Sequence, residues 1–230
     1  MGKPSSPAQK IIVGIDEAGR GPLAGPVVAA AFCVVGKPKF RARGDFDSKK
    51  LKPQWREDLY QILTTHPQVE WGIGQVSEKQ IDNINILQAT RLAMVKAVKN
   101  LQQKLRRRPR ESYHHFSHDR RKSDEYFPID SLIIDGNILL DLPIPQQAIP
   151  KADTTIFSCM AASIIAKVTR DRLILRLHKK YPQYGFDRHK GYGTKLHFAM
   201  LKKHGPCPIH RLSFAPCKPK GLTNPKLLLI

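Results

Sequence analysis

The chain has 230 residues, enough for one large domain or two small ones, and 41% of them are hydrophobic, which excludes a chain that is disordered throughout. Its 39 Lys and Arg against 19 Asp and Glu give a formal net charge of +20, which favours a polyanion such as nucleic acid over an anionic membrane as partner. The longest apolar run, residues 27–35, is too short to span a bilayer, and the four cysteines have no C-x-x-C spacing, so we expect a cytoplasmic protein with reduced thiols.

The first half of the chain predicts two strands, a helix, a third strand and more helix. Residues 11–15 and 27–35 are the first two strands, placed to form a hairpin across a loop rich in Gly and Pro. Residues 53–65 have helical spacing with Pro in the first turn, and a third strand starts at Val69. The apolar spacing over residues 78–105 is typical of one long helix or two short ones.

The second half opens with a basic segment, residues 104–127, which we interpret as an exposed loop or insertion. It is either a solvated charged loop or a grip on nucleic acid. A short apolar strand then ends at Asp135, and a further extended segment leads to Asp153. The apolar periodicity after it predicts a long helix that packs on the sheet, with Thr154 or Thr155 as its cap.

Three carboxylates fall at or just beyond the ends of extended segments: Asp16, Asp135 and Asp153. If those segments are neighbours in one sheet, the carboxylates meet at one edge, and we expect Glu17 to join them because the first strand ends there. Four carboxylates repel one another unless cations lie between them, and oxygen ligands favour Mg²⁺ or Mn²⁺ over zinc. Two such ions could activate a water and stabilise the leaving oxygen of a phosphodiester. For Asp153 alone, a helix cap is an equal alternative.

Seven segments, in order and over nearly the whole chain, resemble bacterial type 2 ribonuclease H (ribonuclease HII): GIDEAGRGPLAGPVVAA, DSKKL, INILQAT, IDGN, AASIIAKVTRDR, YPQYGFDRHKGYGTKLH and GPCPIHRLSFAP. The resemblance implies an α/β fold with a ribonuclease H-like mixed five-stranded sheet, flanking helices and a helical C-terminal extension. We expect a catalytic domain over residues 1–180 and a basic extension over residues 181–230 that packs on it and clamps the duplex.

The resemblance also implies an activity, namely metal-dependent endonucleolytic cleavage of the RNA strand of RNA/DNA hybrids. It includes nicking 5′ of single ribonucleotides embedded in duplex DNA, which leaves 3′-hydroxyl and 5′-phosphate ends and serves ribonucleotide excision repair. Carried over by residue, the ligands of two Mg²⁺ or Mn²⁺ ions are Asp16, Glu17, Asp135 and Asp153. The family often has Gly-Asp where this chain has Ala152 before Asp153.

Substrate contacts follow from the same resemblance. Gly19, Arg20 and Gly21 would read the ribonucleotide through backbone contact with its 2′-hydroxyl, and Tyr192 would pack on the next deoxyribose and sense the RNA-to-DNA junction. A plain turn and a half-buried tyrosine are the alternatives from the residues alone. Further phosphate contacts are expected at Ser48 and Lys49, with Lys167, Arg170 and Arg172 as weaker candidates. The histidines at 189, 197, 204 and 210 are assigned to surface or packing positions rather than to acid–base chemistry.

The C-terminal region is basic, with ten Lys and Arg between His178 and Lys220, Arg211 among them, against Asp187 alone. Such a region can bind duplex phosphates without sequence preference. The apolar tail, residues 226–230, docks either on the protein itself or on a sliding clamp, and we expect a monomer. Two other functions stay open: a type 3 ribonuclease H, and a non-catalytic basic RNA-binding protein.

Overall fold

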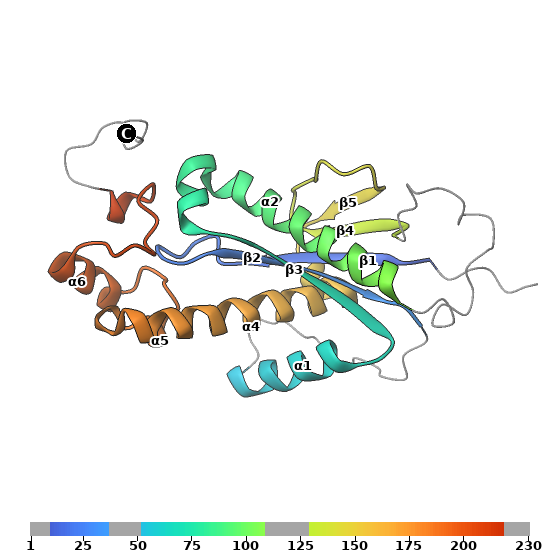
Figure 1. Cartoon of the computed structure of the whole chain (residues 1–230), viewed down its shortest axis with the longest axis horizontal. Helices are drawn as coiled ribbons and strands as arrows, with labels where there is room; N and C mark the ends of the chain where they lie inside the picture. The colour runs from blue at the N-terminus through green and yellow to red at the C-terminus, as the bar shows by residue number, and fades with distance from the viewer. Residues whose placement is uncertain (1–9, 37–51, 109–128, 219–230) are drawn as a thin grey trace, which may run out of the picture.

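A computed structural model describes residues 10–36, 52–108 and 129–218 of the chain (Figure 1). The strands are β1 (Ile12–Ala18), β2 (Val27–Val34), β3 (Val69–Val76), β4 (Ser131–Asp135) and β5 (Gln146–Ile149). The helices are α1 (Pro53–Thr65), α2 (Glu78–Arg107), α3 (Ala152–Thr155), α4 (Phe157–Lys180), α5 (Phe186–His189) and α6 (Lys195–His204), with 3₁₀ turns η3 (Pro182–Tyr184) and η4 (Ala215–Cys217). The predicted sequence of strands and helices is confirmed, apart from the boundaries discussed below.

The five strands form one mixed sheet in the order β3-β2-β1-β4-β5. The pairs β1–β2 and β2–β3 are antiparallel, whereas β1–β4 and β4–β5 are parallel. Ile15 of β1 is paired with Ile134 of β4, so the next residue of each strand, Asp16 and Asp135, falls at the same level of the sheet. The five-stranded mixed sheet is therefore confirmed, and its register brings two of the predicted carboxylates onto neighbouring strands.

Helices cover both faces of the sheet, which explains why β1 and β2 are apolar on both faces (Figure 1). The core on one face includes the buried side of α2, and the core on the other face is built from α4 with Leu63 of α1. Close packing of α4 under β1 requires glycine at position 14, because a Cβ there would lie 2.2 Å from the main-chain carbon of Ser158. Helix α4 is thereby fixed beneath the strand that carries Asp16.

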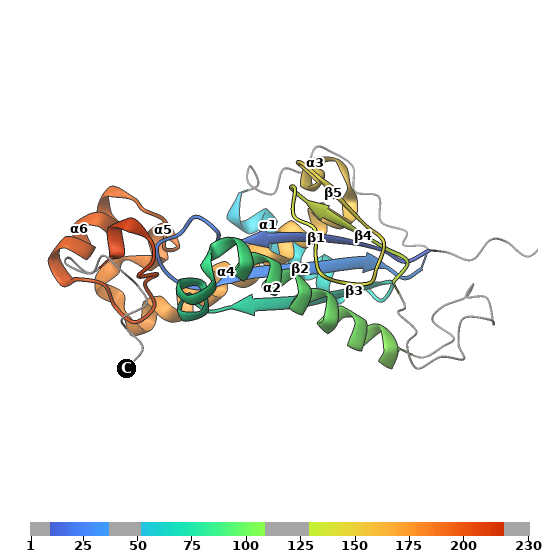
Figure 2. The same cartoon turned by 90° about the horizontal axis from the view of Figure 1, so that it is seen from above.

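The segment after α4 packs beyond the end of the sheet, where α5 and α6 lie in Figure 2. A separate apolar cluster joins Phe186 and Leu201 of this segment to Ile174 of α4 and to Leu23 and Ala24 of the β1–β2 loop. The chain after Lys180 is thus built onto the loop that follows β1. The division into domains at residue 180 remains a prediction.

Two local predictions are wrong. Strand β1 does not end at Ile15 but continues to Ala18, because Asp16, Glu17 and Ala18 keep their pairing with Ala30, Ala29 and Val28 of β2. The long helix α4 has Ile156 at its N-cap with no side-chain cap, since Thr154 and Thr155 belong to the separate turn α3.

The helix predicted over residues 78–105 is interrupted. Helix α2 contains Asn85 at φ 64°, ψ 166°, so it consists of a short piece and a long piece, which is neither the single long helix nor the two short ones that the spacing left open. The short piece carries Asp82, whose carboxylate accepts hydrogen bonds from the N–H groups of Leu212 and Ser213 at 2.9 Å and from the Ser213 hydroxyl at 2.6 Å. Asp82 thus ties α2 to the C-terminal segment. Within the described ranges, no helix has the length and apolar composition needed to cross a membrane.

Candidate metal centre

The structure brings three of the predicted carboxylates together. Asp16 lies in β1, Asp135 ends β4 and Asp153 lies in the first turn of α3, and one oxygen from each lies within 4.8 Å of the others. The main-chain N–H of Asp153 also donates to Asp135 Oδ1 at 3.4 Å. The left-handed residue Lys151, at φ 61°, turns the chain between β5 and α3 and so delivers Asp153 to the two strands.

The electrostatics of this cluster favour a bound cation. Asp16 and Asp153 are buried, with 5% and 2% of their surface exposed. Burial and then the charges of Glu17 and Asp135 raise the pKa of Asp16 well above its usual range, while hydrogen bonds from the Ser163 side chain and the Glu17 N–H oppose that rise. Buried carboxylates at this spacing offer only oxygen ligands, the donor set of Mg²⁺ and Mn²⁺. The residues present therefore fit a hard divalent cation.

Glu17 lies beside this cluster but is not one of the three. Its Oε1 accepts a hydrogen bond from Arg20 Nη1 at 3.3 Å, and both side chains form an ion pair. Burial raises the pKa of Glu17, the Arg20 charge lowers it, and Asp135 raises it again, so the two carboxylates are close enough to interact. Glu17 was expected to join the carboxylates because the first strand would end at that point. That reason is wrong, because β1 continues through Glu17 to Ala18.

The Gly19–Arg20–Gly21 segment is held from behind by a buried arginine. Arg211, with no exposed surface, donates from Nη2 to the Gly19 carbonyl at 2.6 Å and from Nη1 to the Arg20 carbonyl at 2.8 Å. Because a trans peptide points its C=O and N–H in opposite directions, the N–H groups of Arg20 and Gly21 point away from Arg211. The loop therefore has a fixed set of main-chain donors on its other side.

A second buried arginine supports the same loop. Arg170 of α4 has no exposed surface, and its guanidinium donates to the carbonyls of Pro26, Ala24 and Lys190 at 3.0–3.1 Å. A Cβ at Gly19, where φ is +99°, would lie 2.0 Å from Arg170 Nε, so only glycine fits there. The weaker prediction that Arg170 contacts a phosphate is wrong, because the side chain is buried and its three nitrogens are used by the main chain.

Tyr192 lies next to this loop, as the resemblance requires. A Cβ on Gly21 would lie 3.8 Å from Cε1 of the Tyr192 ring, which is 43% exposed. The Nζ of Lys167 lies 5.8 Å from the centre of that ring and also 2.9 Å from Asp171 Oδ1. Gly21, Tyr192 and Lys167 thus line one surface.

Other predicted contacts lie elsewhere. Ser48 and Lys49 fall outside the described residues. Arg172 forms an ion pair with Glu57 and packs over the Tyr60 ring. Of the four histidines assigned to surface or packing positions, His189, His197 and His210 are buried and His204 is exposed.

Sequence reasoning missed the supporting role of Arg211, which it counted among the exposed basic residues of the C-terminal region. Arg211 lies between buried His210 and half-buried Leu212. The charge of an arginine does not show whether its side chain is buried or exposed to solvent. Burial and the charge of Arg170 lower the pKa of Arg211 but leave it protonated at neutral pH. Because Arg211 is fully buried and its guanidinium donates to main-chain carbonyls, it cannot contact a phosphate.

Comparison with known proteins gives a consistent picture. Residues 13–217 match the family model described as Ribonuclease HII. The chain is 49% identical over 210 residues to ribonuclease HII of Chlamydia caviae, covering 90% of this chain and 85% of that protein. It is also 49% identical over 206 residues to ribonuclease HII of Acetivibrio thermocellus, covering 89% and 70%.

Solved structures show the same fold. Ribonuclease H2 from Pyrococcus horikoshii is 27% identical, with a TM-score of 0.59 over 90% of this chain and 95% of that one. The PCNA:RNase HII complex from Archaeoglobus fulgidus is 23% identical, with a TM-score of 0.65 over 89% and 95%.

Proposed function

The chain belongs to the ribonuclease HII family and is a ribonuclease H, and on this premise we propose that it nicks duplex DNA on the 5′ side of embedded ribonucleotides. It also cleaves the RNA strand of RNA/DNA hybrids, and both reactions leave 3′-hydroxyl and 5′-phosphate ends. The observation that carries the proposal is the meeting of Asp16, Asp135 and Asp153 beside an exposed tyrosine and a glycine loop. A basic RNA-binding protein without activity would have no use for that cluster.

Asp16, Asp135 and Asp153 would hold divalent cations, Mg²⁺ or Mn²⁺, with Glu17 as a fourth ligand. When bound, such ions lower the pKa of a coordinated water and neutralise charge on the cleaved phosphate, and two are expected during catalysis. The Ser163 side chain holds the Asp16 carboxyl by a hydrogen bond. No side chain is needed as general base, which agrees with the absence of His189, His197 and His210 from this cluster.

The loop around Gly21 and the Tyr192 ring would read the sugar. The N–H groups of Arg20 and Gly21 point away from Arg211, so they can hydrogen-bond the 2′-hydroxyl that distinguishes RNA from DNA. Tyr192 would pack on the adjacent deoxyribose, and Arg20 and Lys167 would hold phosphates. Ser48 and Lys49 keep their proposed phosphate contacts, although they lie outside the described residues.

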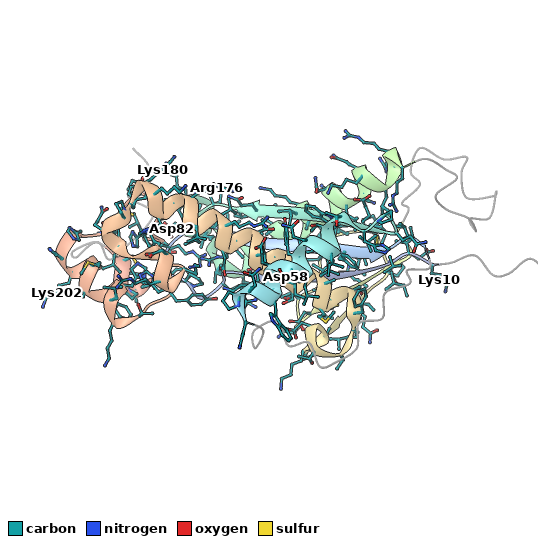
Figure 3. All side chains as sticks on the ribbon, turned by 90° about the horizontal axis from the view of Figure 1, so that it is seen from below. Lys10, Asp58, Asp82, Arg176, Lys180 and Lys202 are labelled. Atoms are coloured by element: carbon teal, nitrogen blue, oxygen red, sulfur yellow. The ribbon has the colours of Figure 1, made fainter. Side chains whose placement is uncertain are left out.

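The C-terminal segment would bind the duplex backbone. The exposed basic residues here include Lys180, Lys195 and Lys202, and Figure 3 shows Lys180 and Lys202 projecting from this end of the molecule. Phosphate contacts of this kind add affinity without sequence preference and weaken as salt rises. We also propose a cytoplasmic monomer that acts in ribonucleotide repair; its four cysteines are free thiols.

The apolar tail, residues 226–230, lies outside the described residues, and both of its predicted docking surfaces remain proposals. One is the protein itself and the other is a sliding clamp. The Archaeoglobus fulgidus relative forms a complex with PCNA, which supports keeping the second.

Replacing Asp16 by Asn tests the proposed centre. We expect the variant to lose nicking of a duplex with one ribonucleotide, because the substitution removes a ligand charge, and to keep measurable binding of that duplex. Cleavage is followed on a labelled strand with Mg²⁺ or Mn²⁺, with chelator as control, and the end groups are identified from the products. Substantial turnover by the variant, or cleavage in the presence of chelator, would contradict the proposal.

A further inference from the structure

Three buried histidine rings lie together in the C-terminal segment, next to the main chain of Tyr192. His189, His197 and His210 are exposed by 8%, 0% and 2%. The His189 and His197 rings are parallel with centres 4.4 Å apart, and the His197 and His210 ring centres are 5.2 Å apart. None of these rings contacts the carboxylate cluster, so the reaction as proposed leaves them without a role.

Hydrogen bonds join two of these rings to the main chain of Tyr192. The Cys207 N–H donates to His210 Nδ1 at 2.9 Å, and the Nε2 atoms of His210 and His197 are 3.0 Å apart. His197 Nδ1 lies 2.9 Å from the Tyr192 carbonyl oxygen, which also accepts from the Thr194 N–H. We call the path from Cys207 N–H through His210 and His197 to the Tyr192 carbonyl the histidine relay.

The partners fix the direction of the histidine relay. A carbonyl only accepts, so His197 Nδ1 carries a hydrogen, and neutral His197 then accepts at Nε2. His210 must therefore donate from Nε2 and accept at Nδ1, which is what the Cys207 N–H requires. The alternative, in which His210 Nδ1 donates to the Cys207 carbonyl at 3.2 Å, would need a second proton on His197. Burial lowers the pKa of both rings and so opposes that proton.

His189 holds the other side of the same turn. Its Nε2 lies 2.9 Å from the Tyr184 carbonyl, so its Nδ1 is free to accept from the Gly191 N–H at 3.2 Å. Its own carbonyl accepts from the Tyr192 N–H at 2.9 Å. The main chain of Tyr192 is thus hydrogen-bonded at both its N–H and its C=O by residues of the histidine stack.

We propose that the histidine relay positions Tyr192, holding its ring against Gly21 so that the enzyme recognises the RNA-to-DNA junction. His197 and His210 are positioning residues, since they act through the Tyr192 main chain and touch no reacting atom. This inference rests on the proposed function, in which Tyr192 packs on the deoxyribose after the ribonucleotide. Tyr192 is 43% exposed, so packing covers its ring only in part and the direction of the ring depends also on its main chain.

Two substitutions of His197 separate the hydrogen bond from the packing. His197→Phe keeps a ring stacked on His189 but removes the donor, whereas His197→Asn loses the ring but places an amide N–H near the position of Nδ1. The readout is the ratio of kcat/KM on a duplex with one ribonucleotide to kcat/KM on a continuous RNA/DNA hybrid. We expect His197→Phe to lower this ratio about ten- to a hundredfold. His197→Asn keeps the donor to the Tyr192 carbonyl but not the acceptor for His210, so we expect it to lower the ratio less than His197→Phe does. His204→Ala, at the exposed end of α6, is the matched control.

A second variant tests the histidine relay in case a His197 variant does not fold. His210→Asn keeps an acceptor for the Cys207 N–H but removes the Nε2 donor, so it interrupts the histidine relay at a different bond. We expect the same selective loss, and thermal unfolding identifies any variant that is not folded. An equal fall on both substrates, or an unchanged ratio in the folded variants, would overturn the relay.

Tyr192→Ala separates two ideas, namely that the histidine relay positions Tyr192 and that Tyr192 recognises the RNA-to-DNA junction. If the histidine relay acts through the tyrosine, adding His197→Phe to Tyr192→Ala lowers the ratio no further. If Tyr192→Ala lowers the ratio and the second substitution lowers it again by the full factor, only the relay is wrong. If Tyr192→Ala leaves the ratio unchanged, junction recognition by Tyr192 is wrong and the relay fails with it.

Discussion

Gly19 and Gly21 lie two residues apart in one loop, but they have different surroundings. A Cβ at Gly19 would overlap the Arg170 side chain in a backbone conformation that favours glycine, whereas a Cβ at Gly21 would make ordinary contact with the Tyr192 ring. The first glycine is required by the fold. The second is exposed, so its missing side chain matters for what approaches from outside.

We therefore predict that Gly19→Ala and Gly21→Ala affect different properties. Gly19→Ala should lower the unfolding temperature by several degrees, because a strained φ and a displaced Arg170 cost about 1–3 kcal/mol. Gly21→Ala should leave the unfolding temperature near native but lower nicking at a ribonucleotide, because its methyl group occupies the place of the sugar. Calorimetry and the nicking assay measure the two effects. Native nicking by a folded Gly21→Ala protein would contradict the proposed close approach of the substrate.

At the level of residues, the sequence predicts the three carboxylates of the cluster and misses the arginines that support the loop. Asp135 and Asp153 were identifiable because each falls at or just beyond the end of an extended segment, and both lie in the cluster. The buried position of Arg211 was not identifiable, because the residues next to it in the sequence do not indicate it. The carbonyls that accept its hydrogen bonds lie about 190 residues away. Only the folded structure shows that the Arg211 guanidinium is buried.

Helix α2 shows how one exposed residue can set the course of an element. Asn85 combines φ 64° with ψ 166°, a conformation that is essentially restricted to glycine, and its Oδ1 accepts from the N–H groups of Leu87 and Gln88 at 3.0 and 3.1 Å. It both breaks the helix and caps the longer piece. The shorter piece can then present Asp82 to Leu212 and Ser213.

We predict that Asn85→Ala lowers the free energy of unfolding by about 0.5–2 kcal/mol, because it loses the cap and gains nothing from the strain, which it keeps. Asn85→Gly loses the cap but relieves the strain, so it should lie within a few tenths of a kcal/mol of native. Urea unfolding compares the two. If both variants lose the same stability, the strain assigned to Asn85 is not real.

At the level of elements, apolar periodicity predicted which strands and helices are present, but not the residues at which they end. The buried strands β1 and β2 and the helix α4 follow directly from it, because burial on one or both faces determines where apolar residues fall. The end of β1 was misjudged because Asp16 and Glu17 look like the close of a strand, whereas β2 pairs with them through to Ala18. Partner strands determine strand ends, and a single sequence does not contain that pairing.

For the whole molecule, the buried histidines predict a pH dependence of stability. Burial, and then the neighbouring His197, lower the pKa of His210 to about 4 from 6.5, and burial also lowers the pKa of His189 and His197. The folded chain therefore binds fewer protons than the unfolded chain between those values. The stability from these groups is fully present above about pH 6.5 and is lost as the pH falls toward 4. The charges of Asp187 and Lys190 act on the pKa of His189 with opposite signs, Asp187 raising it and Lys190 lowering it.

The measurement is the free energy of unfolding in urea at several pH values from 7.5 to 4.5. His210→Asn should show a shallower fall over this range than the native protein, because it lacks one of the shifted groups, whereas His204→Ala should follow the native curve. Parallel curves for His210→Asn and the native protein would show that His210 does not cause the loss of stability at low pH.

Helix α4 runs from the carboxylate cluster toward the basic residues that we propose bind the duplex. The Ser163 side chain holds Asp16, and Lys180 projects from the other end (Figure 3). Between these residues the helix rises about 26 Å, at about 1.5 Å per residue. Phosphates follow one another every 3.4 Å or so along each strand, which makes this length about seven or eight base pairs. On the proposed function, a duplex shorter than this could reach the carboxylate cluster or the basic residues near Lys180, but not both at once.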